Sequence, residues 1–212
     1  MSIGKLFTNL FVLLPYHTPG LIEAGLDEAG RGCLAGPVVA AAVVLPPDYQ
    51  HPRLTDSKRL TARQREVLRA DILRDAFAWA VAEASVAEIE QLNIAQASYL
   101  AMHRAVAALA ITPEHLLVDG NRFRAYAPIP HTCIVRGDAT FLAIAAASVL
   151  AKQHRDALMD TLDAEFPAYG WARNAGYPTP AHQATLRQHG PTPHHRRTFR
   201  LEYPAHCQGS LP

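Results

Sequence analysis

Apolar residues form short runs in the first part of the chain and fall at helical spacing further on. Two runs, 21–28 and 38–45, are bounded by Gly and Pro and predict a pair of strands. An alternating segment at 77–84 predicts a third strand, and 116–120 and 131–135 predict two more. The second run is apolar at almost every position, which is typical of a strand buried on both faces.

Helices are predicted between these strands where an N-cap residue precedes helix-spaced apolar positions. A capping box at Thr61 opens a helix to about Asp75, and a second one at Ser85 opens a short helix. Asn93 is the expected cap of a longer helix in the segment that Pro113 ends. The first of these helices precedes the third strand, and the other two lie between the third and fourth strands.

The C-terminal half is predicted to be mainly helical. An Ala-rich segment with apolar residues at helical spacing predicts a helix from Asp138 to about Phe166, and 167–178 is expected to be a loop. Thr179 before Pro180 starts a last helix. Strands followed by alternating strands and helices predict an α/β fold, with a mixed sheet and helices on both faces.

Composition agrees with one globular domain. The chain has 212 residues, of which 49% are hydrophobic and 18% charged, and its formal net charge is +1. A balanced charge implies no strong overall attraction to nucleic acid or membrane. However, 166–201 contains no Asp or Glu, and it carries five arginines and four histidines. This segment is either a solvated surface or a face that binds a polyanion.

The cysteines and the N-terminal run indicate where the protein works. Cys33, Cys133 and Cys207 have no spacing that suits a disulfide framework or a zinc site, so we expect a reducing cytoplasm. The apolar run at 10–14 is too short to span a membrane, and we expect it to pack on the body of the protein.

Four carboxylates stand at or near predicted strand ends, namely Asp27, Glu28, Asp119 and Asp138. Singly, each has a simpler explanation, since Asp119 precedes a glycine in a possible turn and Asp138 is a good N-cap. Together, converging carboxylates would repel one another unless cations neutralise them. Oxygen ligands favour Mg²⁺ or Mn²⁺, and two such ions about 4 Å apart suit attack of water on a phosphodiester.

Several motifs, in order along the chain, resemble those of the type 2 ribonucleases H of bacteria, the ribonuclease HII family. The resemblance extends from about residue 21 to 199. It rests on GLDEAGRGCLAGPVVAAAVVLP (25–46), DSKRL (56–60), NIAQA (93–97), LLVDGN (116–121), RGD (136–138), AAASVLAKQHRD (145–156), YGW with NAGYPTPAH (169–182) and GPTPHHRRTF (190–199).

The resemblance implies a ribonuclease H-like fold with a small helical C-terminal extension. The expected division is an N-terminal segment (1–20), a catalytic domain (21–166), the extension (167–204) and a tail (205–212), which we expect to be partly disordered. The family's metal ligands correspond to the four carboxylates already named. Its ribonucleotide sensor corresponds to Gly30, Arg31, Gly32 and Tyr177, which together would detect a 2′-OH.

The implied activity is cleavage of RNA in RNA–DNA hybrids and cleavage 5′ of single ribonucleotides in duplex DNA, with Mn²⁺ or Mg²⁺ as cofactor. We expect a monomer without membrane association. Further phosphate contacts are expected at Lys58, Arg136, Arg196 and Arg197, although each is also a candidate for a solvated surface.

The sequence departs from the family pattern at two positions, and two other functions are possible on the same fold or site. Cys33 stands where proline is common, and Arg136 where lysine is common, and neither change puts the activity in doubt. A junction-resolving nuclease on the same fold would have no use for a 2′-OH sensor. A nucleic-acid-binding module without activity would be expected to lack one of the four acids. The sister type with an added N-terminal binding domain is disfavoured, because about 20 residues precede the first strand.

Overall fold

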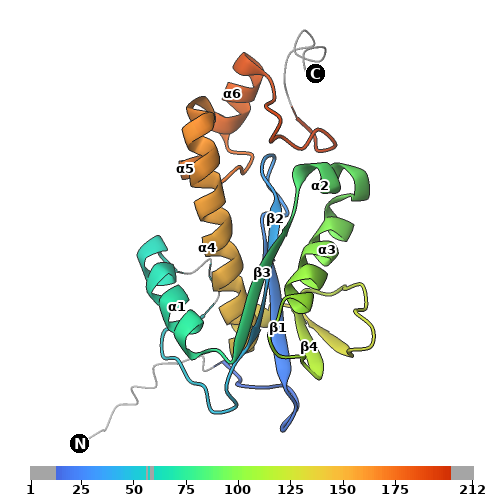
Figure 1. Ribbon diagram of the computed structural model, residues 1–212. Coiled ribbons are helices and arrows are strands. Elements are labelled where there is room, and N and C mark those ends of the chain that lie inside the picture. Colours follow the sequence, from blue (N-terminus) through green and yellow to red (C-terminus); the bar gives the residue numbers. More distant parts are fainter. Residues whose placement is uncertain (1–12, 56, 58–59, 202–212) are drawn as a thin grey trace, which may run out of the picture.

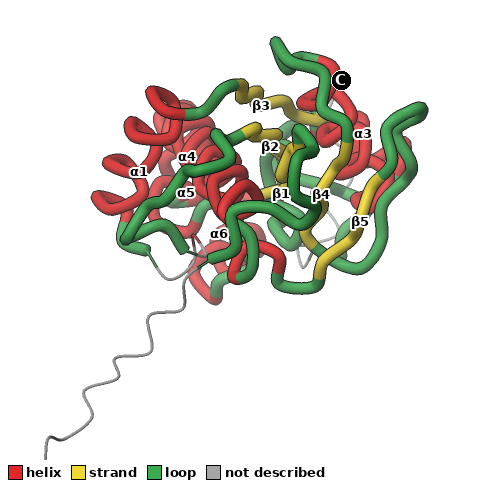
Figure 2. The backbone as a smooth tube through the Cα atoms, turned by 90° about the horizontal axis from the view of Figure 1, so that it is seen from below, coloured by secondary structure: helices red, strands yellow, loops and turns green. Residues whose placement is uncertain are grey.

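A computed structural model describes residues 13–55, 57 and 60–201 of the chain. One sheet has the strand order β3-β2-β1-β4-β5 (Figures 1 and 2). Its strands are β1 (Glu23–Ala29), β2 (Val38–Val44), β3 (Ala78–Ala84), β4 (His115–Asp119) and β5 (His131–Ile134). β2 pairs antiparallel with β1 and β3, whereas β1, β4 and β5 run parallel. The predicted mixed sheet is confirmed.

Helices cover both faces of the sheet (Figure 1). One face packs against α3 (Ile94–Ala107), with α2 (Val86–Leu92) beside it. The other face packs against α4 (Leu142–Glu165), which α1 (Ala62–Asp75) covers from outside. Every residue of β2 is buried because its alternating side chains enter the two cores, as the apolar run predicted.

Helix α4 crosses β1 at Gly25, two residues before Asp27. A Cβ atom on Gly25 would lie 2.2 Å from the carbonyl carbon of Ala143 and 2.3 Å from the backbone nitrogen of Ile144. Only glycine allows the helix backbone this close to the strand. The contact fixes the first turn of α4 beside the end of β1, where the candidate site lies.

The predicted caps are confirmed, and the start of the long helix is not. Thr61 and Ser85 form complete capping boxes, and the Asn93 side chain accepts hydrogen bonds at the start of α3. However, α4 begins at Leu142, and Asp138 lies in a separate 3₁₀ turn, η2 (Gly137–Ala139). Asp138 is therefore not the N-cap of the long helix, and its carboxylate serves another purpose.

The segment after α4 packs against the far end of that helix (Figure 1). It contains η3 (Pro167–Tyr169), α5 (Trp171–Asn174) and α6 (Pro180–His189), so the loop predicted at 167–178 includes two short helical turns. Trp171 is completely buried there and joins Leu34 and Met159 in a small core. The expected tail lies outside the described residues, as does most of the apolar run at 10–14.

No helix in the described part of the chain is long and apolar enough to cross a membrane.

Candidate active site

Three aspartates from three elements meet at the carboxyl end of the parallel strands. Asp27 lies in β1, Asp119 ends β4, and Asp138 lies in η2 directly after β5. Leu26 of β1 pairs with Val118 of β4, so the next residue of each strand is one of the two acids. Candidate ligand oxygens of the three side chains lie within 4.8 Å of one another. The parallel register therefore brings together acids that are far apart in sequence.

Backbone hydrogen bonds orient two of these carboxylates. The Glu28 N–H donates to Asp27 Oδ1 at 2.6 Å, and the Gly137 N–H donates to Asp119 Oδ1 at 2.7 Å. The second bond ties the end of β4 to the turn that carries Asp138. A Cβ on Gly137 would lie 2.5 Å from Ile144 Cδ1, so glycine also lets this turn approach α4.

The site concentrates negative charge in a buried position. Asp27 is 5% exposed and Asp138 is 4% exposed. Burial raises the pKa of Asp27 well above its usual range, and the charges of Glu28 and Asp119 raise this pKa further. A divalent cation would neutralise these charges, and carboxylate oxygens are the ligands that Mg²⁺ and Mn²⁺ prefer. The three aspartates thus fit such a metal.

Glu28 is not in the group formed by the three aspartates. It neighbours Asp27 in a strand, where successive side chains point to opposite faces. Its Oε1 accepts a hydrogen bond from Arg31 Nη1 at 3.0 Å. The structure therefore brings three of the four predicted ligands into one cluster, and the role of Glu28 as a ligand stays a prediction.

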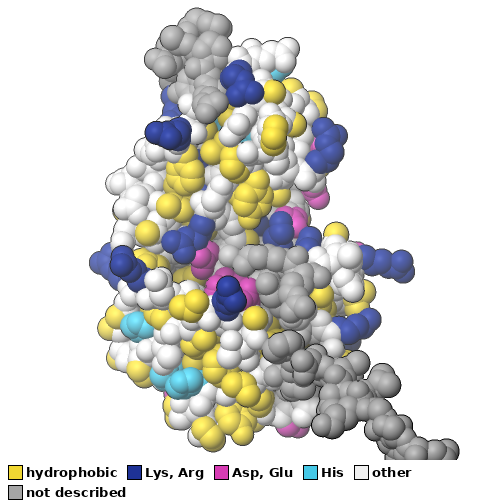
Figure 3. Space-filling view, turned by 180° about the vertical axis from the view of Figure 1, so that it is seen from behind, with side chains coloured by type: hydrophobic (Ala, Val, Ile, Leu, Met, Phe, Trp, Pro, Cys, Tyr) yellow, Lys and Arg dark blue, Asp and Glu magenta, His cyan; other side chains and the backbone are white. Residues whose placement is uncertain are grey.

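A cleft of about 710 Å³ opens beside the acids. Glu28 and Asp119 line it, together with three arginines, Arg31, Arg122 and Arg124. It is also lined by polar and aromatic side chains that suit a nucleic acid, among them Gln96, Tyr99, Asn121 and Phe123. On the face drawn in Figure 3, acidic side chains lie among Lys and Arg side chains near mid-height.

Sequence reasoning missed Arg122 and Arg124 as candidates. The available signal was their position, three and five residues after Asp119, where cations beside a strand-end acid are well placed to hold a phosphate.

The glycine-rich turn after β1 lies against the segment that carries Tyr177. The Leu34 N–H donates to the Gly176 carbonyl at 2.8 Å, and a Cβ on Gly176 would lie 2.7 Å from the Ala35 carbonyl oxygen. Arg31 and Gly32 are exposed, and Tyr177 is 43% exposed. The turn and the tyrosine therefore both reach the surface from neighbouring backbone segments.

The family model described as Ribonuclease HII matches residues 24–205 of this chain. The chain belongs to the ribonuclease HII family. It is an endoribonuclease with an acidic metal-binding site. The ribonuclease HII of Bacteroides thetaiotaomicron is 56% identical over 190 residues, covering 90% of this chain and 95% of the relative. That of Cytophaga hutchinsonii is 58% identical over 191 residues, with coverage of 90% and 95%.

Solved structures of the family have the same fold. The ribonuclease H2 of Pyrococcus horikoshii OT3 aligns with a TM-score of 0.71 and 26% identity, over 84% of this chain and 93% of that one. The ribonuclease HII in a PCNA complex from Archaeoglobus fulgidus aligns with a TM-score of 0.69 and 24% identity, over 86% and 96%. The predicted family and fold class are thus confirmed.

One predicted phosphate contact is wrong. Arg196 is completely buried, so it cannot present its guanidinium to a phosphate at the surface. Its guanidinium donates to backbone carbonyls inside the protein. The neighbouring Arg197 is exposed, and so is Arg136, whose backbone has the left-handed conformation with φ of 58°. Lys58 lies outside the described residues.

Two of the four histidines in the basic segment 166–201 are also buried, so they do not form part of a face that binds a polyanion. His182 Nδ1 donates to the Tyr177 carbonyl, and its Nε2 accepts from Trp171 Nε1. His195 Nδ1 accepts the Thr192 N–H, so its Nε2 carries the proton and donates to His182 at 3.0 Å. These partners are satisfied when both rings are neutral, and burial lowers the pKa of each.

Proposed function

We propose that the enzyme hydrolyses the RNA of RNA–DNA hybrids and cuts on the 5′ side of single ribonucleotides in duplex DNA. The observation that carries the proposal is the convergence of Asp27, Asp119 and Asp138 beside an arginine-lined cleft. The proposed metal ligands are these three aspartates and Glu28, with Mn²⁺ or Mg²⁺ as cofactor. A structural neighbour, a ribonuclease HIII, was solved in complex with Mn²⁺.

Divalent cations bound at such a site supply an activated water and stabilise the leaving 3′ oxygen. The contribution of the chain is to prepare that site. The backbone bonds from Glu28 and Gly137 hold the Asp27 and Asp119 carboxylates in place before substrate arrives. Arg122 and Arg124 would hold phosphates of the duplex in the cleft.

Recognition of the ribonucleotide is proposed to lie in the turn and Tyr177. A 2′-OH both donates and accepts hydrogen bonds, so exposed backbone groups at Arg31 and Gly32 suit it. Gly32 supports this assignment, because a Cβ there would have no heavy atom within 4 Å, outside its chain neighbours. The space in front of it is open to a sugar. Arg136 and Arg197 are proposed as outer phosphate contacts, and so is Lys58.

We also propose that the enzyme is a monomer and that it acts in the cytoplasm. Two other functions are less well supported. A binding module without activity would not need three acids in one cluster, two of them buried. A junction-resolving nuclease would not need a sugar sensor beside them.

A labelled duplex tests the proposal directly. The substrate carries one ribonucleotide, and a matched duplex of DNA alone is the control. The expected result is one cut on the 5′ side of the ribonucleotide, only when Mn²⁺ or Mg²⁺ is present. Cutting of the all-DNA duplex at the same rate, or cutting that persists in a chelator, would contradict the proposal.

A further inference from the structure

Two arginines are buried beneath the glycine-rich turn. Arg155 of α4 is 1% exposed, and Arg196 is 0% exposed. Within residues 13–55, 57 and 60–201, neither guanidinium has a carboxylate within 4.0 Å. A buried cation without a counter-ion is costly unless other groups satisfy it. The contacts that these two side chains make must therefore offset the cost of burying them.

Arg196 binds the turn from the C-terminal side. Its Nη1 donates to the Arg31 carbonyl at 3.0 Å, its Nε to Gly36 at 2.9 Å, and its Nη2 to Pro37 at 3.1 Å. Its own backbone N–H donates to the Leu34 carbonyl at 2.8 Å. One side chain thus spans both ends of the segment that begins in the turn and enters β2.

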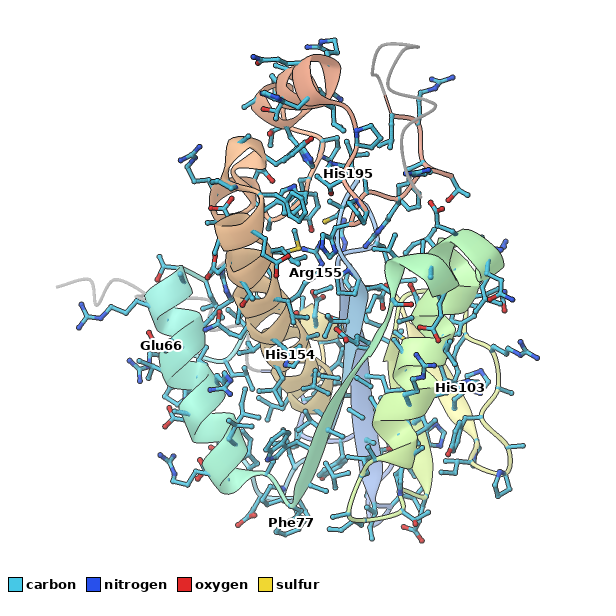
Figure 4. The ribbon with its side chains drawn as sticks, turned by 45° about the horizontal axis from the view of Figure 1, so that its top comes forward. Glu66, Phe77, His103, His154, Arg155 and His195 are labelled. Atoms are coloured by element: carbon cyan, nitrogen blue, oxygen red, sulfur yellow. The ribbon has the colours of Figure 1, made fainter. Side chains whose placement is uncertain are left out.

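Arg155 binds the same segment from α4, and Figure 4 shows it reaching from that helix toward the region below His195. Its Nη2 donates to Ala35 at 3.0 Å and its Nε to Pro37 at 3.2 Å. Its Nη1 donates to Ala175 at 2.8 Å, two residues before Tyr177. One guanidinium therefore joins the turn segment to the tyrosine segment.

Gly30 makes room for this arrangement. Its φ is +97°, and a Cβ on it would lie 2.0 Å from Arg155 Nε and 2.6 Å from Arg155 Cδ. Because Arg155 is held by three hydrogen bonds, it could not move aside without losing them. The two glycines of the turn therefore differ, since Gly30 accommodates an arginine and Gly32 faces open space.

We infer that Arg155 and Arg196 are positioning residues, which hold the turn Gly30–Gly32 and Tyr177 at the spacing needed to recognise a ribonucleotide. The inference rests on the proposed function. A planar guanidinium with several fixed donors sets the relative positions of several carbonyls at once, which an ammonium group does not. All six bonds from the two guanidinium groups end on the turn segment or next to Tyr177. A connection that merely joined β1 to β2 would not need two buried charges.

The test replaces Arg196 with lysine, which keeps the charge and loses the fork of donors. Initial rates are measured for Arg196→Lys and wild type on a single-ribonucleotide duplex and on a continuous RNA–DNA hybrid. We expect the rate on the single-ribonucleotide duplex, divided by the rate on the hybrid, to be about tenfold lower in the variant than in wild type. This is the loss expected when one buried hydrogen-bonding contact is removed. Mn²⁺ binding, measured by calorimetry, should be unchanged because the aspartates are untouched.

The controls separate positioning from general destabilisation. Ile72→Val removes one methylene from the core to which α1 and α4 contribute. It should lower the melting temperature without changing the ratio of rates. If Arg196→Lys does not fold, Arg155→Lys is measured in the same way.

Each possible result has a defined meaning. An unchanged ratio in a folded lysine variant would overturn the inference, as would failure of both lysine variants to fold. A wild type that does not cut the single-ribonucleotide duplex would instead overturn the proposed function.

Discussion

The catalytic cluster and the turn beside it bury opposite charges by opposite means. In the cluster, three aspartates share a small space, and burial together with mutual repulsion raises the pKa of Asp27. In the turn region, two guanidinium groups are buried, and backbone carbonyls surround them in place of carboxylates. The cluster is incomplete without a cation, whereas the turn region is satisfied by the protein alone.

This difference separates two tasks. Carboxylates in an acidic cluster repel one another until a cation binds. Relief of this repulsion therefore contributes to the free energy of metal binding. A turn held by many fixed hydrogen bonds has little freedom to move, which suits a group that must distinguish one hydroxyl. The contrast predicts that changes in the cluster should affect chemistry without loss of stability, and that changes in the turn region should affect stability or selectivity.

The largest effect is expected for Asp27→Asn and Asp138→Asn. Each substitution removes a proposed metal ligand, so cleavage should fall far more than tenfold, a loss in barrier well above about 1.4 kcal/mol. The melting temperature in a chelator should stay the same or rise, because one of the repelling charges is gone.

Initial rates at saturating metal and thermal unfolding check this prediction. Asp160→Asn, at an exposed position of α4, is the matched control and should leave both quantities unchanged. Retention of more than about a tenth of the wild-type rate by either active-site variant would show that the assigned site is wrong.

The next largest effect concerns stability at low pH. Burial, with a smaller contribution from the nearby His182 and His194, lowers the pKa of His195 to about 3. Below the unfolded pKa of about 6.5, the unfolded chain takes up a proton that the folded protein does not, so stability falls as pH falls. His195 alone should cost about 2 kcal/mol between pH 8 and pH 5.

Urea unfolding at a series of pH values measures this effect. His195→Asn should be less stable at pH 7 and should show a flatter pH dependence, whereas the exposed His189→Asn should behave like the wild type. Equal slopes for His195→Asn and wild type would mean that the C-terminal histidines do not control acid stability.

The same two regions differ in how far the sequence predicts them. The cluster was predictable, because β1, β4 and β5 have clear apolar patterns and strand ends of a parallel sheet meet at one edge. Asp138 shows the limit of local reasoning, since its position after Gly137 also matches a helix N-cap. Only the bond from Gly137 to Asp119, 18 residues away, places it in the site.

The turn region was not predictable in the same way. Arginine is almost never fully buried, so a basic segment without acids favours a surface, and Arg196 was interpreted accordingly. Its partner Arg31 is 165 residues away, and no periodicity or capping rule reports such a contact. Residues 166–201 contain no Asp or Glu, and this agrees with the structure for Arg196. Its guanidinium is paired with backbone carbonyls and not with carboxylates.

A smaller and more specific effect is expected for Tyr177→Ala. The variant should lose about tenfold more rate on a single-ribonucleotide duplex than on a continuous hybrid, because one contact of about 1–3 kcal/mol is removed. The ratio of initial rates on the two substrates is the measurement.

Tyr177→Phe keeps the ring and removes the hydroxyl, so it separates stacking on the sugar from hydrogen bonding. If the ratio is the same in wild type and Tyr177→Ala, the tyrosine only packs against the turn, and the exposed backbone around Gly32 must distinguish the ribonucleotide alone.

The smallest effect is expected for Arg197, on the salt dependence of duplex binding. Arg197 is exposed and directly follows Arg196, which is completely buried, so only the former is placed to meet a phosphate. Neutralising one phosphate contact should lower the slope of log affinity against log salt by about one, with little change in selectivity.

Duplex binding by Arg197→Ala is therefore compared with binding by the wild type at several salt concentrations, with Asp138→Asn in both to prevent cleavage. Arg74→Ala is the control, because Arg74 is exposed on α1 and pairs with Asp71 and Asp75. A slope equal to that of the wild type would mean that Arg197 belongs to a solvated surface. Of these two neighbouring arginines, only the buried Arg196 would then act on the substrate, through the turn whose carbonyls it binds.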